Sequence, residues 1–419
     1  MRVAAVIDPY SAGSLLGAEL GRRDFARVAV QSSEDVPKVF RSTYDPTAFD
    51  AVIVHRGDLD ETAGQLRKRG VDCVVPGCEL GVELADRLRD RLSLHPNDPD
   101  LGEARRDKFR MVEAIRTHGL RAPLQHCSED SREILDWVRA NGTWPVVAKP
   151  LASSSSDGVH LCHTEADLLR AFRAIQAQRN VLGSINRGVL VQEYLEGDEY
   201  VVDTVSRDGH HRVAAFWRYG RAASSQGFIP YDSIHLLPGE GEIQRSLFEY
   251  ASGVLDALGV RHGPAHIELM WVDGAPCIIE MGARLTAGKN TLLNRLCSGV
   301  CQIDLTIDAY ADPARFLRGT RSTYDREKSA VVVFLIPPRP GRLRDLSLRS
   351  ELETLPSLHE LSLRVRPGDH VEGIVGMAIL LHDDEAAVAR DLERIRELER
   401  VGLFALEGEA DPDLDRRAG

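Results

Sequence analysis

From residue 1 to residue 95, short apolar runs alternate with segments of helical periodicity. The apolar runs, which predict strands, are 2–8, 51–55 and 73–76. The segments with apolar positions at helical spacing are 15–20, 61–69 and 81–88. Strands that alternate with helices predict a parallel sheet with crossover helices. Because H-P-N-D-P-D at 95–100 is a loop sequence, we expect an α/β domain over residues 1–97.

The pattern changes after residue 97. Helical periodicity occupies 104–118, 165–178 and 243–258, and apolar strands are expected to end at Lys149 and to span 189–194. Two hairpins follow, one around Asp208-Gly209 and one around 273–275. A new unit is expected from residue 330, with strands at 330–336, 361–366 and 374–381 and a helix at 384–400. We therefore expect a central domain over 98–329 and a small C-terminal α+β part over 330–419.

The second hairpin places two glutamates in strands that are otherwise apolar. Glu268 lies in A-H-I-E-L-M-W and Glu280 in C-I-I-E-M. If D-G-A at 273–275 forms the turn, the two glutamates pair, with Cβ atoms about 4.5–5.5 Å apart. Like charges in apolar surroundings repel, and a divalent cation removes the repulsion. A slipped register would instead send one glutamate to solvent.

A lysine and a serine-rich loop follow one another in V-V-A-K-P-L-A-S-S-S-S-D-G-V. Lys149 ends an apolar strand, where an ammonium group needs an anionic partner. The loop offers backbone N–H groups and hydroxyls, which suit a cover over phosphates, from Ser153, Ser154, Ser155, Ser156 and Gly158. Serine-rich loops also serve as plain linkers. Lys108, in a predicted helix, is equally well explained as a surface lysine.

The segment V-Q-E-Y-L-E-G-D-E-Y begins as a buried strand and ends in a turn. The backbone of Gln192, Glu193, Tyr194 and Leu195 can hydrogen-bond an adenine edge. Glu199, seven residues after Gln192, can accept hydrogen bonds from ribose hydroxyls. Taken alone, this segment is equally a strand with acidic flanks.

Composition narrows the class of protein. The 419 residues are 43% hydrophobic and 28% charged, which is typical of a globular chain. The net charge of -12 gives no general attraction to nucleic acid or to anionic membranes, so we expect neither partner. The longest apolar run, from Ala330, is strand-sized, and Asp8 interrupts the N-terminal run before an export signal can form. Seven scattered cysteines without paired C-x-x-C spacing indicate reduced thiols, so we expect a cytoplasmic protein.

Taken in order, these motifs resemble those of the ATP-grasp superfamily. The order is a lysine in an early helix, a lysine on a strand, a Ser/Gly loop, a hinge with a ribose-binding glutamate, and two metal-binding glutamates on adjacent strands. Over about residues 100–290 the chain is most similar to bacterial L-amino acid ligases, which join free amino acids into dipeptides. The resemblance implies an ATP-grasp fold with a Rossmann-like pre-grasp domain (1–97). It also implies an ATP-grasp domain (98–329), with a lid subdomain at about 122–195, and a C-terminal capping part (330–419).

The resemblance also implies a role for each motif. Lys108 and Lys149 would hold the phosphates of ATP under the loop 153–158, Gln192–Leu195 would frame adenine, and Glu199 would hold ribose. Glu268 and Glu280 would bind Mg²⁺, as two ions, with Mn²⁺ as a substitute. Lys149, Glu280 and Arg284 would be the catalytic residues.

One signature departs from the common pattern of the superfamily. Many members have E-x-N where this chain has E-M-G-A-R at 280–284, and the asparagine is a further metal ligand. Gly282 cannot bind metal, whereas E-x-G-x-R matches the amino acid ligases. Arg284 then takes the place of the arginine that clamps the substrate carboxylate and its acyl phosphate. The departure leaves two glutamates as the expected protein ligands.

Substrate residues are expected in and around 220–241. Asp232 and His235 have the same spacing as an acidic residue and a histidine in some of these ligases. In that role they could bind the amino group of the substrate or deprotonate the attacking amine. Loop residues of these types are also often only solvated. His266 is expected to line the site. Glu79 can approach the cleft from the pre-grasp domain. A glutamate at this position is equally well explained by its place at a helix N-terminus. By resemblance we expect small-molecule substrates, a carboxylate and an amine, and a homodimer.

The implied reaction forms an amide through an acyl phosphate, with release of ADP and phosphate. An alternative within the class is a ligase of secondary metabolism that uses a non-proteinogenic acid or amine. A different class is a catalytically silent ATP-binding regulator, which would be expected to lack Lys149, Glu268, Glu280 or Arg284; all four are present. A nicotinamide enzyme is disfavoured because S-A-G-S-L-L-G lacks the dinucleotide glycine fingerprint.

Overall fold

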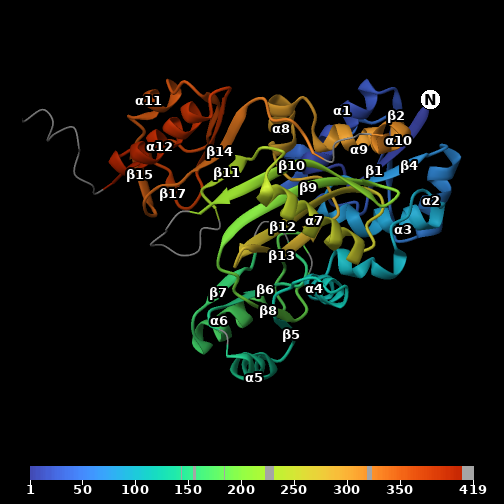
Figure 1. The fold of residues 1–419 in the computed structure, drawn as a ribbon, viewed down its shortest axis with the longest axis horizontal. Coiled ribbons are helices and arrows are strands. Elements are labelled where there is room, and N and C mark those ends of the chain that lie inside the picture. Colours follow the sequence, from blue (N-terminus) through green and yellow to red (C-terminus); the bar gives the residue numbers. More distant parts are fainter. Residues whose placement is uncertain (143, 154–156, 184, 222–230, 319–322, 408–419) are drawn as a thin grey trace, which may run out of the picture. The chain divides into compact units, whose positions relative to one another are not determined.

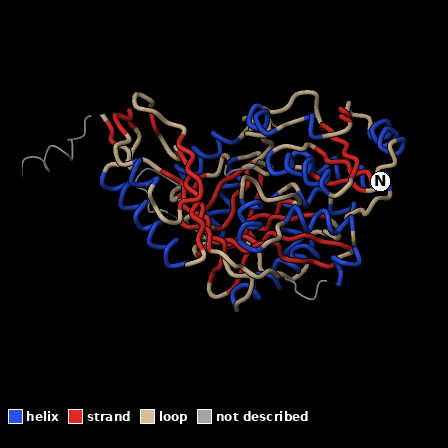
Figure 2. The backbone as a smooth tube through the Cα atoms, turned by 90° about the horizontal axis from the view of Figure 1, so that it is seen from above, coloured by secondary structure: helices blue, strands red, loops and turns tan. Residues whose placement is uncertain are grey.

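The chain forms two compact units (Figure 1). The computed structural model describes residues 1–142, 144–153, 157–183, 185–221, 231–318 and 323–407. The first unit comprises residues 1–216, 239–295 and 299–324. The second comprises residues 217–238, 296–298 and those from 325 onward. Figure 2 distinguishes the helices from the strands along the same backbone.

A four-stranded parallel sheet opens the first unit, as the alternation of strands and helices predicted. Its strands, in the order β3-β2-β1-β4, are β1 (Arg2–Ile7), β2 (Phe25–Gln31), β3 (Ala51–Val54) and β4 (Cys73–Pro76). The helices of this part are α1 (Ser14–Arg22), α2 (Leu59–Lys68) and α3 (Val82–Leu92). Ala5 and Ile7 lie in one core cluster with residues of α2 and α3, whereas Ala4 and Val6 lie in another with residues of α1. The sheet is therefore covered on both faces.

The strand order of this sheet reverses between β1 and β4. In open α/β sheets, ligands bind outside the carboxyl ends of the strands at such a switch point. Asp8 follows β1 there, and Glu79 begins the short 3₁₀ turn η4 (Glu79–Gly81) that follows β4.

A second, antiparallel sheet forms the middle of the first unit. Its strands, in the order β5-β8-β6-β7, are β5 (Gln125–Ser128), β8 (Val189–Glu193), β6 (Val146–Lys149) and β7 (His160–Cys162). The helix α4 (Lys108–Thr117) precedes it, and α5 (Ser131–Asn141) and α6 (Glu165–Ile175) pack on one face of the sheet (Figure 1). Val146 and Ala148 of β6 and Val191 of β8 pack against these two helices. Because side chains alternate along a strand, Lys149 and Gln192 point to the opposite face.

A third sheet, of which four strands lie in the first unit, carries the two glutamates. Its strands, in the order β13-β12-β9-β10, are β13 (Ala275–Gly282), β12 (Gly263–Val272), β9 (Asp198–Arg207) and β10 (His210–Gly220). The remaining helices are α7 (Glu242–Ala257), α8 (Asn290–Ser298), α9 (Gln302–Ala311) and α10 (Pro313–Arg318). Gln302 fastens α9 to this sheet, because its side-chain amide donates to the carbonyls of Thr204 at 3.1 Å and Ala265 at 2.9 Å.

The second unit contains a run of antiparallel strands and its own hydrophobic core. The end of β10 pairs there with β11 (Ser233–Leu236), and β14 (Ser329–Leu335), β18 (Gly376–His382) and β16 (Leu358–Leu363) follow in that order. A small sheet consists of β17 (His370–Val371), β15 (Gly341–Asp345) and β19 (Ala405–Leu406). The helices are α11 (Arg349–Glu353) and α12 (Glu385–Val401), and Ile395 and Leu398 of α12 are completely buried. The strand predicted at 361–366 is real but begins earlier, at Leu358.

Two further observations concern the chain as a whole. Within the described residues, no helix combines the length and apolarity that a membrane span requires. All seven cysteines are unpaired. Burial raises the pKa of the Cys73 and Cys78 thiols to about 12, so both stay in the unreactive thiol form near neutral pH.

Candidate active site

Glu268 on β12 and Glu280 on β13 are direct cross-strand partners. The turn between the strands differs from the expected three-residue loop. Val272 pairs with Ala275, and Asp273 and Gly274, both with positive φ, form a two-residue turn. If the register set by this turn continued without interruption, Glu280 would lie opposite Ile267.

A β-bulge corrects the register before the glutamates are reached. Glu268 lies opposite Glu280, but Leu269 lies opposite Ile278, so Ile279 is the extra residue on β13. The predicted pairing is thus confirmed, whereas the predicted turn is wrong. If Ile279 were instead paired regularly, Glu280 would lie opposite Ile267 and on the other face of the sheet from Glu268, because side chains alternate along a strand.

One face of this sheet collects several charged side chains. Residues that pair across antiparallel strands point to the same side. Asp203 on β9 pairs with His266, and Glu199 on β9 pairs with Met270, two residues beyond Glu268 on β12. The side chains that share this face are Glu199, Asp203, His266, Glu268 and Glu280.

Lys108 connects the glutamate pair to the serine-rich loop. Its Nζ lies 3.0 Å from Oε2 of Glu280 and donates to the backbone carbonyl of Ser153 at 3.1 Å. Burial raises the pKa of Glu280, but the cations of Lys108 and Lys149 outweigh it and hold that pKa below its usual range. Lys108 is therefore a partner of the site rather than an isolated surface lysine.

Lys149 ends β6 as a buried ammonium group. Its side chain is 5% exposed, and Nζ donates to Oε1 of Gln192 at 2.9 Å. Burial lowers the pKa of Lys149 to about 8, although Glu280, Glu268 and Glu199 act in the opposite direction. These interactions show that Lys149 and the three glutamates share one electrostatic environment.

Arg284 meets a carboxylate of the N-terminal sheet. Its Nε donates to Oε2 of Glu79 at 3.1 Å, and Arg106 pairs with Oε1 of the same carboxylate. Burial raises the pKa of Glu79, but Arg106 and Arg284 outweigh it, so that pKa lies below its usual range. Gly282 makes room for this contact, because a Cβ there would lie 3.0 Å from Oε2 of Glu79 and 3.2 Å from Cζ of Arg284. The glycine of E-x-G-x-R thus leaves space for the arginine.

His266 lies between two carboxylates. Its Nδ1 is 2.7 Å from Oδ1 of Asp203, and its Nε2 is 3.2 Å from Oε1 of Glu268. Burial lowers the pKa of His266, but Asp203 and Glu268 outweigh it and raise that pKa to about 9. The ring is only 5% exposed, so it is a buried neighbour of Glu268 and offers little surface to a substrate.

The loop after Lys149 is described at its two ends. Ser153 donates from Oγ to Oδ2 of Asp157 at 2.9 Å, and the same carboxylate oxygen accepts from the backbone N–H of Val181 at 2.7 Å. Gly158 has φ +71°, where an added Cβ would also lie 2.9 Å from Pro150. Ser154, Ser155 and Ser156 lie outside the described residues.

The segment predicted to frame adenine begins inside a sheet. Gln192 pairs with Gln125 on one side and Val147 on the other, and the backbone N–H of Glu193 donates to the carbonyl of Leu124 at 2.8 Å. Tyr194 and Leu195 come after the end of β8. Glu199, predicted to hold ribose, is 6% exposed on β9.

Asp232 and His235 belong to the second unit. The hydroxyl of Ser233 donates to Oδ1 of Asp232 at 2.8 Å and lies 3.0 Å from Nε2 of His235. Burial lowers the pKa of His235 to about 4, so its ring is neutral near pH 7. Arg396 lies 3.5 Å from Oδ2 of Asp232. The two residues thus form a local polar group within their unit, and residues 222–230 of the preceding loop lie outside the described residues.

The donors at the glutamate pair fit magnesium. Two carboxylates on one face suit a hard cation that takes its remaining ligands from phosphate and water. No group of three or more His, Cys, Asp or Glu side chains suited to a metal occurs among the residues that the structure places.

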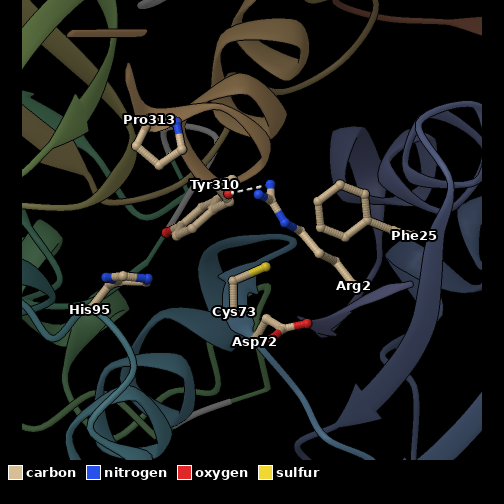
Figure 3. Close-up of a pocket in the computed structure, with 7 residues that line it drawn as sticks. All are labelled: Arg2, Phe25, Asp72, Cys73, His95, Tyr310 and Pro313. Atoms are coloured by element: carbon tan, nitrogen blue, oxygen red, sulfur yellow. Dashed lines mark hydrogen bonds between the residues drawn. The ribbon is translucent and has the colours of Figure 1, made fainter. Parts of the chain in front are cut away.

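A separate cavity of about 210 Å³ lies beside the N-terminal sheet (Figure 3). Its lining residues are Arg2, Phe25, Asp72, Cys73, His95, Tyr310 and Pro313. Arg2 donates from Nη1 to the carbonyl of Tyr310 at 3.0 Å, so its guanidinium already caps the end of α9. The cavity shares no lining residue with the predicted site.

Sequence reasoning missed Asp203 and Arg106. Asp203 is an acidic residue in the otherwise apolar run V-V-D-T-V, and a buried charge there requires a partner. That signal was visible, but the partner lies on another strand. Arg106 is one of many arginines, and its sequence neighbourhood does not distinguish it.

Comparison with known proteins identifies relatives of the whole chain. An ATP-grasp domain model matches residues 143–292. The dapdiamide A synthase of Enterobacter agglomerans is 31% identical over 408 residues, which cover 95% of this chain and 96% of the relative.

Solved structures show the same fold. The L-amino acid ligase from Bacillus licheniformis superposes with a TM-score of 0.71 at 18% identity, over 95% of this chain and 97% of that one. The carboxyaminoimidazole ribonucleotide synthase from Aspergillus clavatus, solved with ATP, superposes with a TM-score of 0.68 at 14% identity, over 95% and 98% of the two chains.

Proposed function

The chain belongs to the ATP-grasp family and is an ADP-forming carboxylate–amine ligase, and we propose that its two substrates are amino acids. The observation that carries the ATP-dependent chemistry of this proposal is the pairing of Glu268 with Glu280 on one face of a sheet, with Lys108 beside them. A carboxylate pair with lysines nearby suits a magnesium–triphosphate complex.

The reaction would proceed in two displacements. An oxygen of the first substrate's carboxylate attacks the γ-phosphorus of ATP, the bond to the β-phosphate oxygen breaks, and ADP leaves. The amine of the second substrate then attacks the carbonyl carbon of the acyl phosphate. The amine loses a proton, inorganic phosphate leaves, and an amide remains.

The residues of the first unit would act by position and charge. Lys108 and Lys149 would neutralise the phosphates, and the loop that begins at Ser153 and ends at Gly158 would cover them. Glu268 and Glu280 would hold Mg²⁺, as two ions, and Mn²⁺ would substitute. When bound, Mg²⁺ offsets charge on the phosphoryl group during its transfer.

Arg284 would receive the substrate carboxylate. A guanidinium can bind a carboxylate through two parallel hydrogen bonds and can later stabilise the tetrahedral oxyanion. Glu79, which accepts from Nε of Arg284, supports this role because it restricts the guanidinium. Lys149 and Glu280 complete the proposed catalytic set.

The nucleotide base would lie against the segment Gln192–Leu195. Because the Glu193 N–H is already bonded to Leu124, the adenine edge would be bound by the backbone beyond β8, at Tyr194 and Leu195. Glu199 would accept from the ribose hydroxyls. Asp232 and His235 are the proposed contacts of the attacking amine, and a homodimer is the proposed assembly.

A second candidate function is favoured by one relative. The protein that matches 95% of this chain is a dapdiamide A synthase, and its name gives a particular product rather than dipeptides in general. A non-proteinogenic acid or amine is therefore the second candidate for one of the two substrates.

The test is a substrate matrix. The protein is incubated with ATP, Mg²⁺ and pairs of amino acids, including non-proteinogenic ones, and phosphate release is measured together with product mass. We expect an amide product with equal amounts of ADP and phosphate. Formation of AMP and pyrophosphate would contradict acyl-phosphate chemistry.

A further inference from the structure

His266 joins two adjacent strands through their acidic side chains. It pairs in register with Asp203 of β9, and Glu268 lies two residues further along β12. The two ring nitrogens lie 2.7 Å from Oδ1 of Asp203 and 3.2 Å from Oε1 of Glu268. Asp203 is 1% exposed and His266 is 5% exposed. The ring is thus held on both sides within the sheet.

The two glutamates of the pair are restrained in different ways. Glu280 meets Lys108, whose flexible side chain also contacts the carbonyl of Ser153. Glu268 meets the planar ring of His266, whose orientation is fixed by Asp203. An imidazole bonded at both nitrogens cannot turn without breaking one contact, so it restricts the carboxylate more strongly than a lysine does.

We propose that His266, oriented by Asp203, is a positioning residue that fixes the carboxylate of Glu268 for the nucleotide-bound metal. With Oε1 held by His266, the second oxygen of Glu268 remains directed for metal binding. Hydrogen bonds from outer residues orient metal-binding side chains in this way in many proteins. The inference rests on the proposed function to the extent that Glu268 binds Mg²⁺.

Two other roles for His266 lead to different measurements. A substrate-contacting histidine would change the KM for an amino acid and leave metal binding unchanged. A purely structural histidine would lower the midpoint of thermal unfolding and leave the metal affinity of the folded fraction unchanged. A positioning residue changes metal affinity in folded protein.

The experiment compares Mn²⁺ binding in full-length variants, with a nonhydrolysable ATP analogue present, by electron paramagnetic resonance. His266→Leu removes both hydrogen bonds, whereas His266→Gln keeps an amide donor near the position of Nε2. His211→Leu is the matched control, because the side chain of His211 is only 6% exposed and lies 2.7 Å from Ser206 and 3.3 Å from Asp256, on β10 of the same sheet.

We expect His266→Leu to weaken Mn²⁺ binding by about 10–100-fold, the usual cost of losing an outer hydrogen bond to a metal ligand. His266→Gln should recover most of this loss, and His211→Leu should bind Mn²⁺ as the wild type does. The free Mg²⁺ concentration at half-maximal turnover should rise in parallel, with little change in the KM for amino acids.

The outcomes separate this inference from the proposed reaction. If ligation occurs and His266→Leu leaves the Mn²⁺ affinity unchanged, the inference is overturned and the function stands. If no substrate pair is ligated but the affinity shifts as expected, the inference stands and the proposed substrates fail. Absence of Mn²⁺ binding by the wild type overturns both. If His266→Leu does not fold, Asp203→Asn and His266→Gln replace it, and unchanged affinity in both overturns the inference.

Discussion

The carboxylate of Glu79 accepts a hydrogen bond from Nε of Arg284 at 3.1 Å, and the two residues are 205 positions apart in the sequence. Glu79 lies at the switch point of the parallel sheet, and Arg284 follows the strand that carries Glu280. The switch-point edge of the N-terminal sheet thereby contacts the proposed substrate arginine. Gly282 permits the approach.

Glu79→Gln should impair both the site and the fold. The change leaves Arg106 and Arg284 without their shared negative partner, and breaking a largely buried ion pair commonly costs about 3–5 kcal/mol. Since these side chains are 13–21% exposed, we expect a smaller loss of unfolding free energy, about 1–3 kcal/mol. The kcat/KM for the carboxylate substrate should fall by about tenfold or more, in proportion to a lost charged hydrogen bond.

The control for this variant is Glu83→Gln. Glu83 is 71% exposed in α3, next to the same switch point, and pairs with Arg87 only at 3.9 Å. Chemical denaturation and steady-state kinetics should show wild-type behaviour for Glu83→Gln. Equal effects in the two variants would mean that the contact with Arg284 has no special role.

Deletion of Ile279 should preserve the pairing of Glu268 with Glu280 and retain turnover. Without the extra residue, Glu280 would directly follow Ile278, which pairs with Leu269, so Glu280 would still lie opposite Glu268 on the same face of the sheet. Ile279→Val keeps the bulge and should cost only about 0.5–1.5 kcal/mol of stability while turnover is retained. Circular dichroism identifies folded protein, and a folded deletion variant without turnover would contradict this register argument.

The protein should lose stability as the pH falls from 7 to 5, in part through His262. Burial and the nearby Arg89 lower the pKa of this histidine to about 3. Between pH 6.5 and 3 the unfolded chain therefore takes up a proton that the folded protein does not, so the unfolding free energy decreases as the pH decreases. The contribution of His262 is up to about 1.4 kcal/mol per pH unit below 6.5.

Urea denaturation at pH 7 and pH 5 measures this effect. His262→Gln should show a smaller difference between the two pH values than the wild type, by about 2 kcal/mol. His118→Gln, at an exposed position, should show the wild-type difference. A steeper pH dependence in His262→Gln would contradict the assignment.

The pairing of Glu268 with Glu280 could be predicted because hairpin geometry is local. The predicted pair is correct although the predicted turn is not, because a two-residue turn and a one-residue bulge together have the same effect on the register as a three-residue turn. The sequence I-I-E at 278–280 is compatible with either of these two arrangements. Lys149 was also predictable, since an apolar strand that ends in lysine requires an anionic partner.

The approach of Glu79 to the cleft was predicted, but its pairing with Arg106 and Arg284 and the contacts of Asp203 could not be predicted in the same way. Each depends on strands or helices that are far apart in the sequence and that meet only when the sheets form. The roles of Asp232 and His235, the two metal ions, the domain boundaries, the homodimer and the cytoplasmic location stay predictions. Ser154, Ser155 and Ser156 lie outside the described residues, so the loop over the phosphates stays a prediction as well.

The central claim is that Glu268 and Glu280 together bind the metal of the nucleotide. The most direct test is anomalous scattering from crystals grown with Mn²⁺ and a nonhydrolysable ATP analogue. We predict an anomalous peak in contact with a carboxylate oxygen of each glutamate and with the triphosphate. A peak at another place, or two glutamate side chains on opposite faces of the sheet, would contradict the account.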